Sequence, residues 1–570
     1  MMPFRAVFLV LVCALATEAG ELKVGQKVYP KLDATGRVDN DEINIAIVPY
    51  PAIVGKIDGD NVWLERAWVK KSDVLTEMEA LKQLDAELVT QPRNTTLLVH
   101  RGIIHRERGN IAEAITDLTL SLRIDPKNAA ARSHRALAWC EASAMDLALA
   151  DANMAVELND EAPDAYIHRS LIWLRMGRQI EALDDLEVAS LLDSTMPRPF
   201  FLRGKVLLGL DGLDDALTQF DGALRRNPCD ADAYALRADV WWRKNEYRKA
   251  IEDFTRVIEF RPNDAAAYSN RGAAYSQLNE NDQALADYTR ALEFNPKLSV
   301  AYSNRGQVWL KRKEFDKCIV ECTMALWFEP ENAYAYYYRG EAWHMKRNYR
   351  LARDDYSSAI DGYTRPARVY SLRGHVCFEL RDFPAAIEDY TKALELAPED
   401  QTAVLNRGLA YQFLRRPDEA LADYTRAIEL DDQDAEPYAL RAGILTDQKK
   451  WSQALDDFEE AHRLQPDDDE ILNSIAWIRA TCPEARYRDA KAALEHARRA
   501  CELRQWKNWM HIDTLAAAYA EAGEFKIAAD WAEKCLALAP RKHHADIQSR
   551  LDLYRAQKPY RETELETDEE

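Results

Sequence analysis

The sequence predicts a mostly α-helical protein in which helix pairs repeat along the chain, preceded by a small β module. Arginine recurs every 34 residues in eleven copies without an insertion or deletion, as in arrays of stacked structural repeats. Glycine supplies only 20 of 570 residues, about half its usual share, which favours helices over turn-rich sheets. Hydrophobic residues make up 47% of the chain, enough to bury a core.

The charge balance restricts the kinds of partner. Lys and Arg total 75 and Asp and Glu total 96, so the formal net charge is -21. Nucleic-acid binding needs a positive surface against the phosphates, and this chain has the opposite balance. We therefore expect no nucleic-acid partner. The composition does not indicate an oligomeric state.

Residues 1–19 have the pattern of a secretory signal peptide. Arg5 precedes an uninterrupted apolar run over residues 6–16, and the small residues Thr17 and Ala19 suit a cleavage site after Ala19. This pattern predicts export to the periplasm or the extracellular space, with an uncleaved anchor as the alternative. No later stretch approaches 18 apolar residues, so we expect no membrane span after signal cleavage.

Residues 21–76 differ in kind from the rest of the chain. Short β-prone runs occupy residues 43–48, 52–57 and 61–64, and Asp58, Gly59 and Asp60 form a tight turn between two of them. The closing run WVKKSDV, residues 68–74, resembles the end of bacterial SH3-like barrels. The resemblance implies an SH3-like β-barrel over residues 21–76, and does not indicate whether the barrel binds anything.

Residues 94–467 form eleven units of 34 residues. Positions are numbered so that residue 95 is position 1 of the first unit. Arginine then stands at position 7, small residues at positions 8, 20 and 27, and proline often at position 32. Aromatic residues recur at positions 4, 11 and 24, as at Tyr268, Trp309 and Tyr288. Positions 4, 8 and 11 share one helical face, and positions 20, 24 and 27 share another. Each unit is therefore predicted to be a pair of helices, A and B, that approach closely at the small residues.

This pattern resembles the tetratricopeptide repeat (TPR) family. The unit AYSNRGAAYSQLNENDQALADYTRALEFNP, ending at Pro296, has the family's large-small-large pattern on helix A and Ala-aromatic-Ala on helix B. The resemblance implies an α-solenoid, a right-handed superhelix of antiparallel helix pairs. A barrel joined to a long array also resembles exported proteins of planctomycete-type bacteria. These are interaction modules, and the resemblance supplies no named partner.

The pattern continues on both sides of the eleven units. Ala80 and Leu84 keep the 34-residue phase with Ala114 and Leu118, so residues 77–93 are predicted to be an orphan helix B that links the barrel to the array. Residues 468–542 fit two further TPRs, the first with a longer turn. Residues 543–556 are predicted to be a capping helix, which a solenoid needs to cover its last apolar face. Residues 557–570 form an acidic tail.

The recurring arginine has a structural explanation. In an antiparallel helix pair, position 7 lies near position 23, which carries a carboxylate in ten repeats of eleven. We therefore predict an ion pair between helices A and B in each unit, with an anion-binding stripe as the alternative. The predicted ladder includes the pairs Arg271 with Asp287, Arg305 with Glu321, and Arg407 with Asp423.

The histidine and cysteine patterns indicate packing rather than metal binding. His100, His134 and His168 recur at 34-residue spacing, and equivalent residues of stacked hairpins should lie too far apart to share one zinc ion. Cys318 and Cys322 lie on one helical face with no histidine at ligand spacing. The sequence therefore predicts no metal and no cofactor, and leaves the pairing of the cysteines open.

Catalytic motifs were sought and none stands out. The chain has no glycine-rich phosphate loop, no HExxH, no GxSxG and no paired CxxC motifs. Its many acidic residues suit solvated helix faces. The sequence therefore predicts a non-enzymatic protein.

The TPR resemblance implies a binding groove on the concave wall, lined by positions 2, 5, 9, 12 and 13 of helix A. An aromatic wall with a few charges suits an extended or helical peptide, so we predict a scaffold or adaptor for peptide or protein partners. A carbohydrate or cell-envelope ligand module and an architectural spacer are the alternatives. The predicted groove residues are Tyr334, Tyr337, Glu341, His344, Met345, Gln307, Lys311, Trp242 and Arg243.

Overall fold

The protein was analysed as a computed structural model, which describes residues 22, 26–31, 35–38, 41–44, 52–58, 60–64 and 67–562. The predicted signal peptide, residues 1–19, and residues 563–570 of the predicted tail lie outside the described residues. The chain divides into two compact units, Met1–Val308 and Trp309–Glu570. Each unit is described below by itself.

The first unit begins with a small antiparallel sheet. Its described strands pair in the order β3-β2-β6-β5-β4-β1-β7 around a core that includes Val28, Val54 and Leu64. The small N-terminal β module is therefore confirmed, whereas its closure into an SH3-like barrel stays a prediction. The strands are β1 (Lys27–Pro30), β2 (Thr35–Val38), β3 (Asp41–Asn44), β4 (Ala52–Asp58), β5 (Asn61–Leu64), β6 (Ala67–Lys70) and β7 (Val74–Leu75), with the short helix η2 (Lys71–Asp73) before β7.

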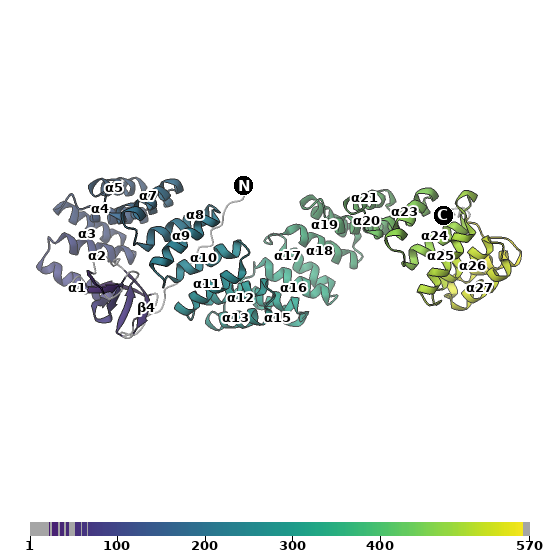
Figure 1. The fold of residues 1–570 in the computed structure, drawn as a ribbon, viewed down its shortest axis with the longest axis horizontal. Helices are drawn as coiled ribbons and strands as arrows, with labels where there is room; N and C mark the ends of the chain where they lie inside the picture. The colour runs from purple at the N-terminus through teal and green to yellow at the C-terminus, as the bar shows by residue number, and fades with distance from the viewer. Residues whose placement is uncertain are drawn as a thin grey trace. The chain divides into compact units, whose positions relative to one another are not determined.

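The sheet connects to the helical array through a buried tyrosine. Tyr29 of β1 is fully buried and joins Leu84 and Leu98 in one apolar cluster. The sheet consequently lies beside α1 (Glu77–Thr90), the helix predicted to link it to the array (Figure 1).

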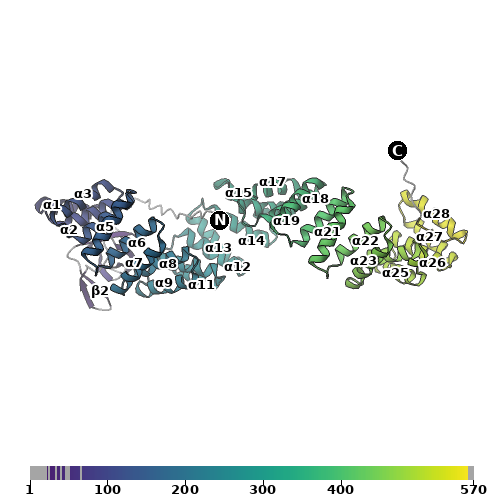
Figure 2. The same cartoon turned by 90° about the horizontal axis from the view of Figure 1, so that it is seen from above.

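Helix pairs then follow one another through the first unit (Figures 1 and 2). Their A helices have 13 residues and their B helices 14, as in α12 and α13. The helices are α2 (Thr95–Glu107), α3 (Ile111–Ile124), α4 (Ala129–Glu141), α5 (Met145–Leu158), α6 (Pro163–Arg175), α7 (Gln179–Leu192), α8 (Pro197–Gly209), α9 (Leu213–Arg226), α10 (Ala231–Arg243), α11 (Tyr247–Phe260), α12 (Ala265–Gln277), α13 (Asn281–Phe294) and α14 (Ser299–Lys311), within which the boundary between the units falls.

The second unit continues the same arrangement and ends in a single helix, α28. The mostly helical array of helix pairs is therefore confirmed. Within the described residues, none of the helices combines the length and apolar character needed to cross a bilayer. The helices are α15 (Phe315–Phe328), α16 (Ala333–Met345), α17 (Tyr349–Ala359), α18 (Pro366–Glu379), α19 (Phe383–Leu396), α20 (Gln401–Phe413), α21 (Pro417–Leu430), α22 (Ala435–Asp447), α23 (Trp451–Leu464), α24 (Asp469–Thr481), η3 (Ala485–Tyr487), α25 (Ala490–Leu503), α26 (Trp509–Glu521), α27 (Phe525–Leu538), η4 (Arg541–His543) and α28 (His544–Arg555).

Local sequence explains where the helices begin and how they pack. Asp264 caps α12 by accepting a hydrogen bond from the backbone N–H of Ala267 at 3.0 Å. Asn279 takes the left-handed conformation, with φ of 59°, in the turn between α12 and α13. At position 8, a Cβ added to Gly408 would lie 2.7 Å from Cε1 of Tyr424. Close approach of helices A and B therefore depends on this small residue.

Successive repeats lie closer together on the helix-A side. In the first unit α4 packs against α6, and in the second unit α24 packs against α26. Among the described residues, the corresponding B helices (α5 and α7, α25 and α27) make fewer contacts with each other. Within each of these stretches the stack therefore curves toward its A helices, which places them on the inner wall.

The last described residues of the predicted acidic tail contact the helical array. The backbone N–H of Glu562 donates to the carbonyl of Thr481 at 3.0 Å, and Trp477 Nε1 donates to the Glu562 carboxylate at 3.2 Å. Arg561 pairs with Glu521 at 2.5 Å. Hydrogen bonds and an ion pair therefore hold residues 561 and 562 against α24 and α26.

Candidate functional site

The recurring arginine pairs with an aspartate of helix B. Arg271 donates from Nε and Nη2 to the two carboxylate oxygens of Asp287, both at 2.8 Å, and Arg407 binds Asp423 at 2.9 and 2.7 Å. In the described part of the chain the same two-bond pair joins Arg101 to Asp117, Arg135 to Asp151, Arg169 to Asp185, Arg237 to Asp253, Arg339 to Asp355, Arg373 to Asp389 and Arg441 to Asp457.

The third guanidinium nitrogen makes a bond that sequence reasoning missed. Nη1 of Arg271 donates to the hydroxyl of Thr255 at 3.1 Å, and Nη1 of Arg407 donates to Thr391 at 3.2 Å. These acceptors lie 16 residues earlier, on helix B of the preceding repeat. Each arginine therefore ties its own helix pair to the previous one. With Nε, Nη1 and Nη2 all engaged in this way, the ladder favours a structural role over anion binding.

Two members of the ladder need separate description. Arg305 and Glu321 belong to different units, and within the first unit Nη1 of Arg305 donates to Thr289 at 3.2 Å. In the fourth repeat Gln219 occupies the aspartate position. Nε of Arg203 and Oε1 of Gln219 are buried without a hydrogen-bond partner. The fourth repeat thus lacks the ion pair of its neighbours.

The predicted groove residues of the eighth repeat lie on α16, but they are not equally accessible. Tyr334 and Met345 are 37% and 60% exposed, whereas Tyr337 is only 2% exposed. Tyr363, in the connection between α17 and α18, stacks on Tyr337 with ring centroids 4.2 Å apart. Burial raises the pKa of the Tyr337 hydroxyl. Tyr337 therefore belongs to the core beneath this face, because the connecting loop places Tyr363 over it.

Charged and ring-bearing groups surround the same face. Nη2 of Arg368, at the start of α18, donates to Glu341 at 3.1 Å. The ring of His344 lies 5.2 Å from that of His375. Burial and the neighbouring His375 lower the pKa of His344. Near neutral pH the face therefore contains an uncharged histidine beside one Arg–Glu pair.

Aromatic side chains continue along the A helices of the next two repeats. Phe378 of α18 and Phe413 of α20 lie 5.5 Å apart, and Phe413 is 61% exposed. Phe383 stacks on Phe413 at 5.0 Å. Phe413 occupies position 13 of its repeat, the position of Met345, so the groove pattern applied to the tenth repeat would have found it. Tyr363 has no such signal, since it lies in the connecting segment.

The other predicted groove residues lie on α10 and α14. Trp242 packs edge-on against Tyr247 at 5.2 Å, and Arg243 pairs with Asp239 at 3.4 Å. Gln307 lies on the part of α14 that belongs to the first unit. Lys311, exposed at the end of α14, belongs to the second. The site that can be built from described contacts is consequently the face formed by α16, α18 and α20.

Two sequence models described as tetratricopeptide repeat match this chain. One matches residues 265–298, 367–400 and 403–434, and the other matches residues 201–265. The array contains tetratricopeptide repeats. No curated protein matches the chain.

Solved structures similar to this chain include two that are described as TPR proteins. The TPR protein YrrB, described as having an unusual peptide-binding site, is 23% identical, with 33% of this chain and 96% of that chain covered and a TM-score of 0.31. The Cut9 and Hcn1 hetero-tetramer of APC/C is 14% identical. The match covers 78% of this chain and 93% of that chain, with a TM-score of 0.36. The C-terminal part of a TPR protein from Cytophaga hutchinsonii is 21% identical. The match covers 41% of this chain and 97% of that chain, with a TM-score of 0.35. Scores of this size support no transfer of function.

Within the TPR array, two histidines lie closer than the repeat spacing predicted. The rings of His134 and His168 are 4.8 Å apart, and Ser133 Oγ lies 2.6 Å from Nδ1 of His168. Burial and nearby positive charges lower the pKa of His134 to about 3. The expected separation is wrong for this pair because α4 and α6 approach so closely.

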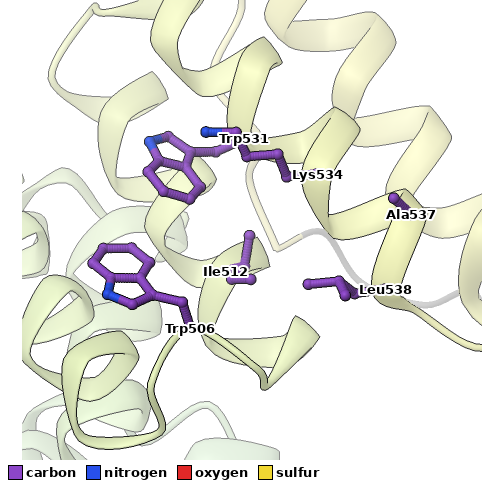
Figure 3. Close-up of a pocket in the computed structure, with 6 residues that line it drawn as sticks. All are labelled: Trp506, Ile512, Trp531, Lys534, Ala537 and Leu538. Carbon is purple, nitrogen blue, oxygen red and sulfur yellow. The ribbon is translucent and has the colours of Figure 1, made fainter.

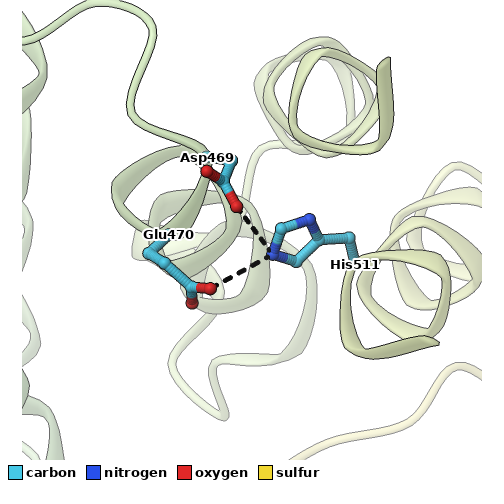
Figure 4. A group of neighbouring side chains, drawn as sticks. All are labelled: Asp469, Glu470 and His511. Carbon is cyan, nitrogen blue, oxygen red and sulfur yellow. Dashed lines mark ion pairs between the residues drawn. The ribbon is translucent and has the colours of Figure 1, made fainter. Parts of the chain in front are cut away.

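A second histidine in the TPR array faces two carboxylates. Nε2 of the buried His511 on α26 lies 3.6 Å from Asp469 and 3.8 Å from Glu470, both at the start of α24 (Figure 4). Arg504 already donates to the same Asp469 oxygen at 2.5 Å, and Asn508 Nδ2 lies 3.2 Å from Nε2. These groups connect α24 to α26, and the guanidinium supplies the positive charge that a metal ion would bring.

An apolar cleft lies near the end of the TPR array. Trp506 and Trp531 stack with ring centroids 5.1 Å apart, and Nζ of Lys534 lies 3.8 Å from the Trp531 ring (Figure 3). Trp506 takes the left-handed conformation, with φ of 61°. The cleft has a volume of about 310 Å³, and Ile512 and Leu538 complete its apolar wall. No sequence motif indicated it.

Proposed function

We propose that this protein is a non-enzymatic scaffold that binds peptide or protein partners on the helix-A face of repeats eight to ten. We name this surface the α16–α20 face and define it by Tyr334, His344, Met345, Phe378 and Phe413. One observation carries the proposal most: Met345 and Phe413, large apolar side chains at the same repeat position, are 60% and 61% exposed on A helices.

The composition of the α16–α20 face suits a peptide. Aromatic side chains provide contact area at a low cost in side-chain entropy, and an exposed methionine adapts its shape to different apolar partners. Arg368, bonded to Glu341 and lying 5.7 Å from the centroid of the Tyr337 ring, offers a charged group for orienting a bound chain. TPR repeats favour such a scaffold role.

The cellular setting is part of the same proposal. Export to the periplasm or extracellular space rests on the pattern of residues 1–19, and an SH3-like barrel over residues 21–76 rests on the closing WVKKSDV run. Expression of the full chain in a bacterial host, followed by N-terminal sequencing of the exported product, tests the first point. A mature chain beginning at Gly20 is the expected result.

Peptide binding can be tested with a random peptide library displayed on phage and selected on the full chain. We expect an enriched peptide whose affinity, measured by calorimetry, falls about tenfold or more in Met345→Glu/Phe413→Glu, as for removal of binding hot spots. Tyr337→Phe should bind normally, because that ring is buried. Leu396→Glu is the matched surface control, since Leu396 is 56% exposed on helix B of the ninth repeat.

Two results would contradict the proposal. The first is a library that yields no enriched peptide. The second is equal affinity of the enriched peptide for the wild type and for Met345→Glu/Phe413→Glu. Retention of the chain on a cell-wall polysaccharide column, lost in a Trp242→Ala variant, would instead favour the carbohydrate alternative.

A further inference from the structure

The B helix of the seventh repeat exposes three large apolar side chains on its solvent side. In α15, Val320 is 60% exposed, Met324 38% and Trp327 79%. Their spacing of four and three residues places them in one row along the helix. We call this row the α15 stripe. Because Trp327 is 79% exposed, most of its apolar surface stays in water and does not contribute to the core of this unit.

In several other repeats the same positions are charged. Positions 26 and 29, which hold Met324 and Trp327 in α15, carry Arg–Glu ion pairs in other repeats. These pairs are Arg256 with Glu259 at 2.6 Å, Arg290 with Glu293 at 2.6 Å, and Arg426 with Glu429 at 3.1 Å. In the seventh repeat, apolar side chains therefore stand where these repeats have a solvated ionic surface. A contiguous exposed apolar row of this kind marks an interaction surface.

The surroundings of the stripe are acidic. At the corresponding positions of the next repeat stand Asp354, Ser358 and Asp361, all exposed, without the arginine that neutralises this row elsewhere. Arg353 lies 3.5 Å from Asp354, a contact between two exposed groups that screens little of the charge. Glu331, exposed just beyond the end of α15, adds another negative charge.

We propose that the α15 stripe binds an amphipathic α-helix of a partner protein, with large apolar residues at i, i+3 or i+4 and i+7 and with Lys or Arg along one margin. The row of three apolar side chains matches one face of such a helix, as in helix packing generally. The acidic positions of α17 and its following turn are complementary to the basic margin. A second copy of this chain fits less well, because each copy has a net charge of -21.

This surface is independent of the α16–α20 face. The stripe lies on a B helix, whereas the face proposed above lies on A helices. A chain carrying both would hold a peptide in the groove and a helix on its outer side.

The test uses a fluorescein-labelled synthetic helix of about five turns with leucine on one face and lysine on the other. Its affinity for the full chain is measured by fluorescence anisotropy at about 150 mM salt, where long-range attraction is screened. We expect binding that is about tenfold weaker for Met324→Arg/Trp327→Glu. This variant copies the residues of α13 and is expected to fold. It also keeps the net charge at -21, because it adds one Arg and one Glu.

A second pair of measurements tests the charge argument. Asp354→Asn/Asp361→Asn should weaken binding several-fold, and a leucine–glutamate helix should bind the wild type more weakly than the leucine–lysine helix. Equal affinity of the leucine–lysine helix for wild type and Met324→Arg/Trp327→Glu would overturn the proposal, since adsorption to an acidic surface would then explain binding. Equal affinity of the two helices for the wild type would contradict the proposal that the partner helix is basic. If the wild type sediments as a dimer and Met324→Arg/Trp327→Glu as a monomer, the α15 stripe binds a second copy of this chain and the proposed partner is wrong.

Discussion

The fourth and sixth repeats have the same backbone plan but different ion pairs. In the sixth, Arg271 binds both oxygens of Asp287 and also reaches Thr255 of the preceding repeat. In the fourth, Gln219 replaces the aspartate, and Nε of Arg203 is buried without a partner. Both repeats still form a helix pair with a buried ring, Phe220 or Tyr288, against the glycine at position 8. Apolar packing therefore builds the repeat, and the ion pair fixes how neighbouring helices align.

The largest expected difference is in how acid affects stability, between the region of repeats two to four and the sixth repeat. The array leading into the fourth repeat buries His134 and His168, and Arg198 of the fourth repeat helps to lower the pKa of His134 to about 3. The unfolded histidine titrates near 6.5, so it takes up a proton that the folded one refuses. Stability of this region should therefore fall between about pH 6.5 and pH 3, by up to about 1.4 kcal/mol per pH unit for each histidine.

Hydrogen exchange at pH 7 and pH 5 measures this difference repeat by repeat. Residues 265–298 of the sixth repeat contain no histidine and should keep their relative protection. His134→Phe removes one of the two buried groups while keeping a ring, and should reduce the pH dependence by about half. A protection pattern in repeats two to four that does not change with pH would contradict the expectation.

Breaking the intact ion pair should have the next largest effect. Asp287→Ala leaves the half-buried guanidinium of Arg271 without its carboxylate, which should lower the free energy of unfolding locally by about 2–3 kcal/mol. The measurement is exchange protection across α12 and α13. Gln219→Ala in the fourth repeat is the matched control and should cost less, because Gln219 is uncharged and forms no ion pair with Arg203; the ion pair of Arg203 is with Glu187 of the preceding repeat, at 3.4 Å. Equal losses would show that the aspartate contributes only packing.

Restoring the missing ion pair should have a smaller, opposite effect. Gln219→Asp gives Arg203 the acceptor that the other repeats have, and should stabilise the fourth repeat by about 1 kcal/mol. Urea denaturation and exchange in α8 and α9 measure it. Gln219→Asn, of the same size but uncharged, should give little or none of this gain. Destabilisation by Gln219→Asp would mean that burying the new charge outweighs the pair.

The smallest effect is expected for the bond between repeats. Thr255→Val keeps the shape of the side chain and removes the acceptor for Nη1 of Arg271, at a cost of about 0.5–1 kcal/mol. Exchange should rise at the contact between α11 and α12 more than within either helix. Protection that falls evenly through both repeats would contradict a bond that acts at their junction.

Much of the fold was predictable because the repeat makes each contact recur. Position 8 must be small where a ring presses on it, and position 7 has a carboxylate opposite in ten of the eleven copies, so the same contacts are indicated repeatedly along the chain. The candidate site was predictable only in part. Tyr334, Glu341, His344 and Met345 do lie together on α16, since they share one helix.

The remainder depended on residues that meet from different elements. Tyr337 was predicted to line the groove, and Tyr363 of the following connection covers it. His134 and His168 were predicted to be well separated, and the close packing of α4 on α6 brings their rings to 4.8 Å. Trp506 and Trp531 form a cleft although 25 positions separate them in the sequence. A single sequence without repeat symmetry at these positions has no signal for such contacts.

The sequence by itself determined that this protein is an array of helix pairs, because the 34-residue period of small, aromatic and ionic residues satisfies one packing geometry. It also determined the acidic net charge of -21. Only the tertiary structure decided which side chains of that plan are accessible. Exposure depends on what the neighbouring repeat and its connecting loop place over a residue, and that is a property of the folded chain.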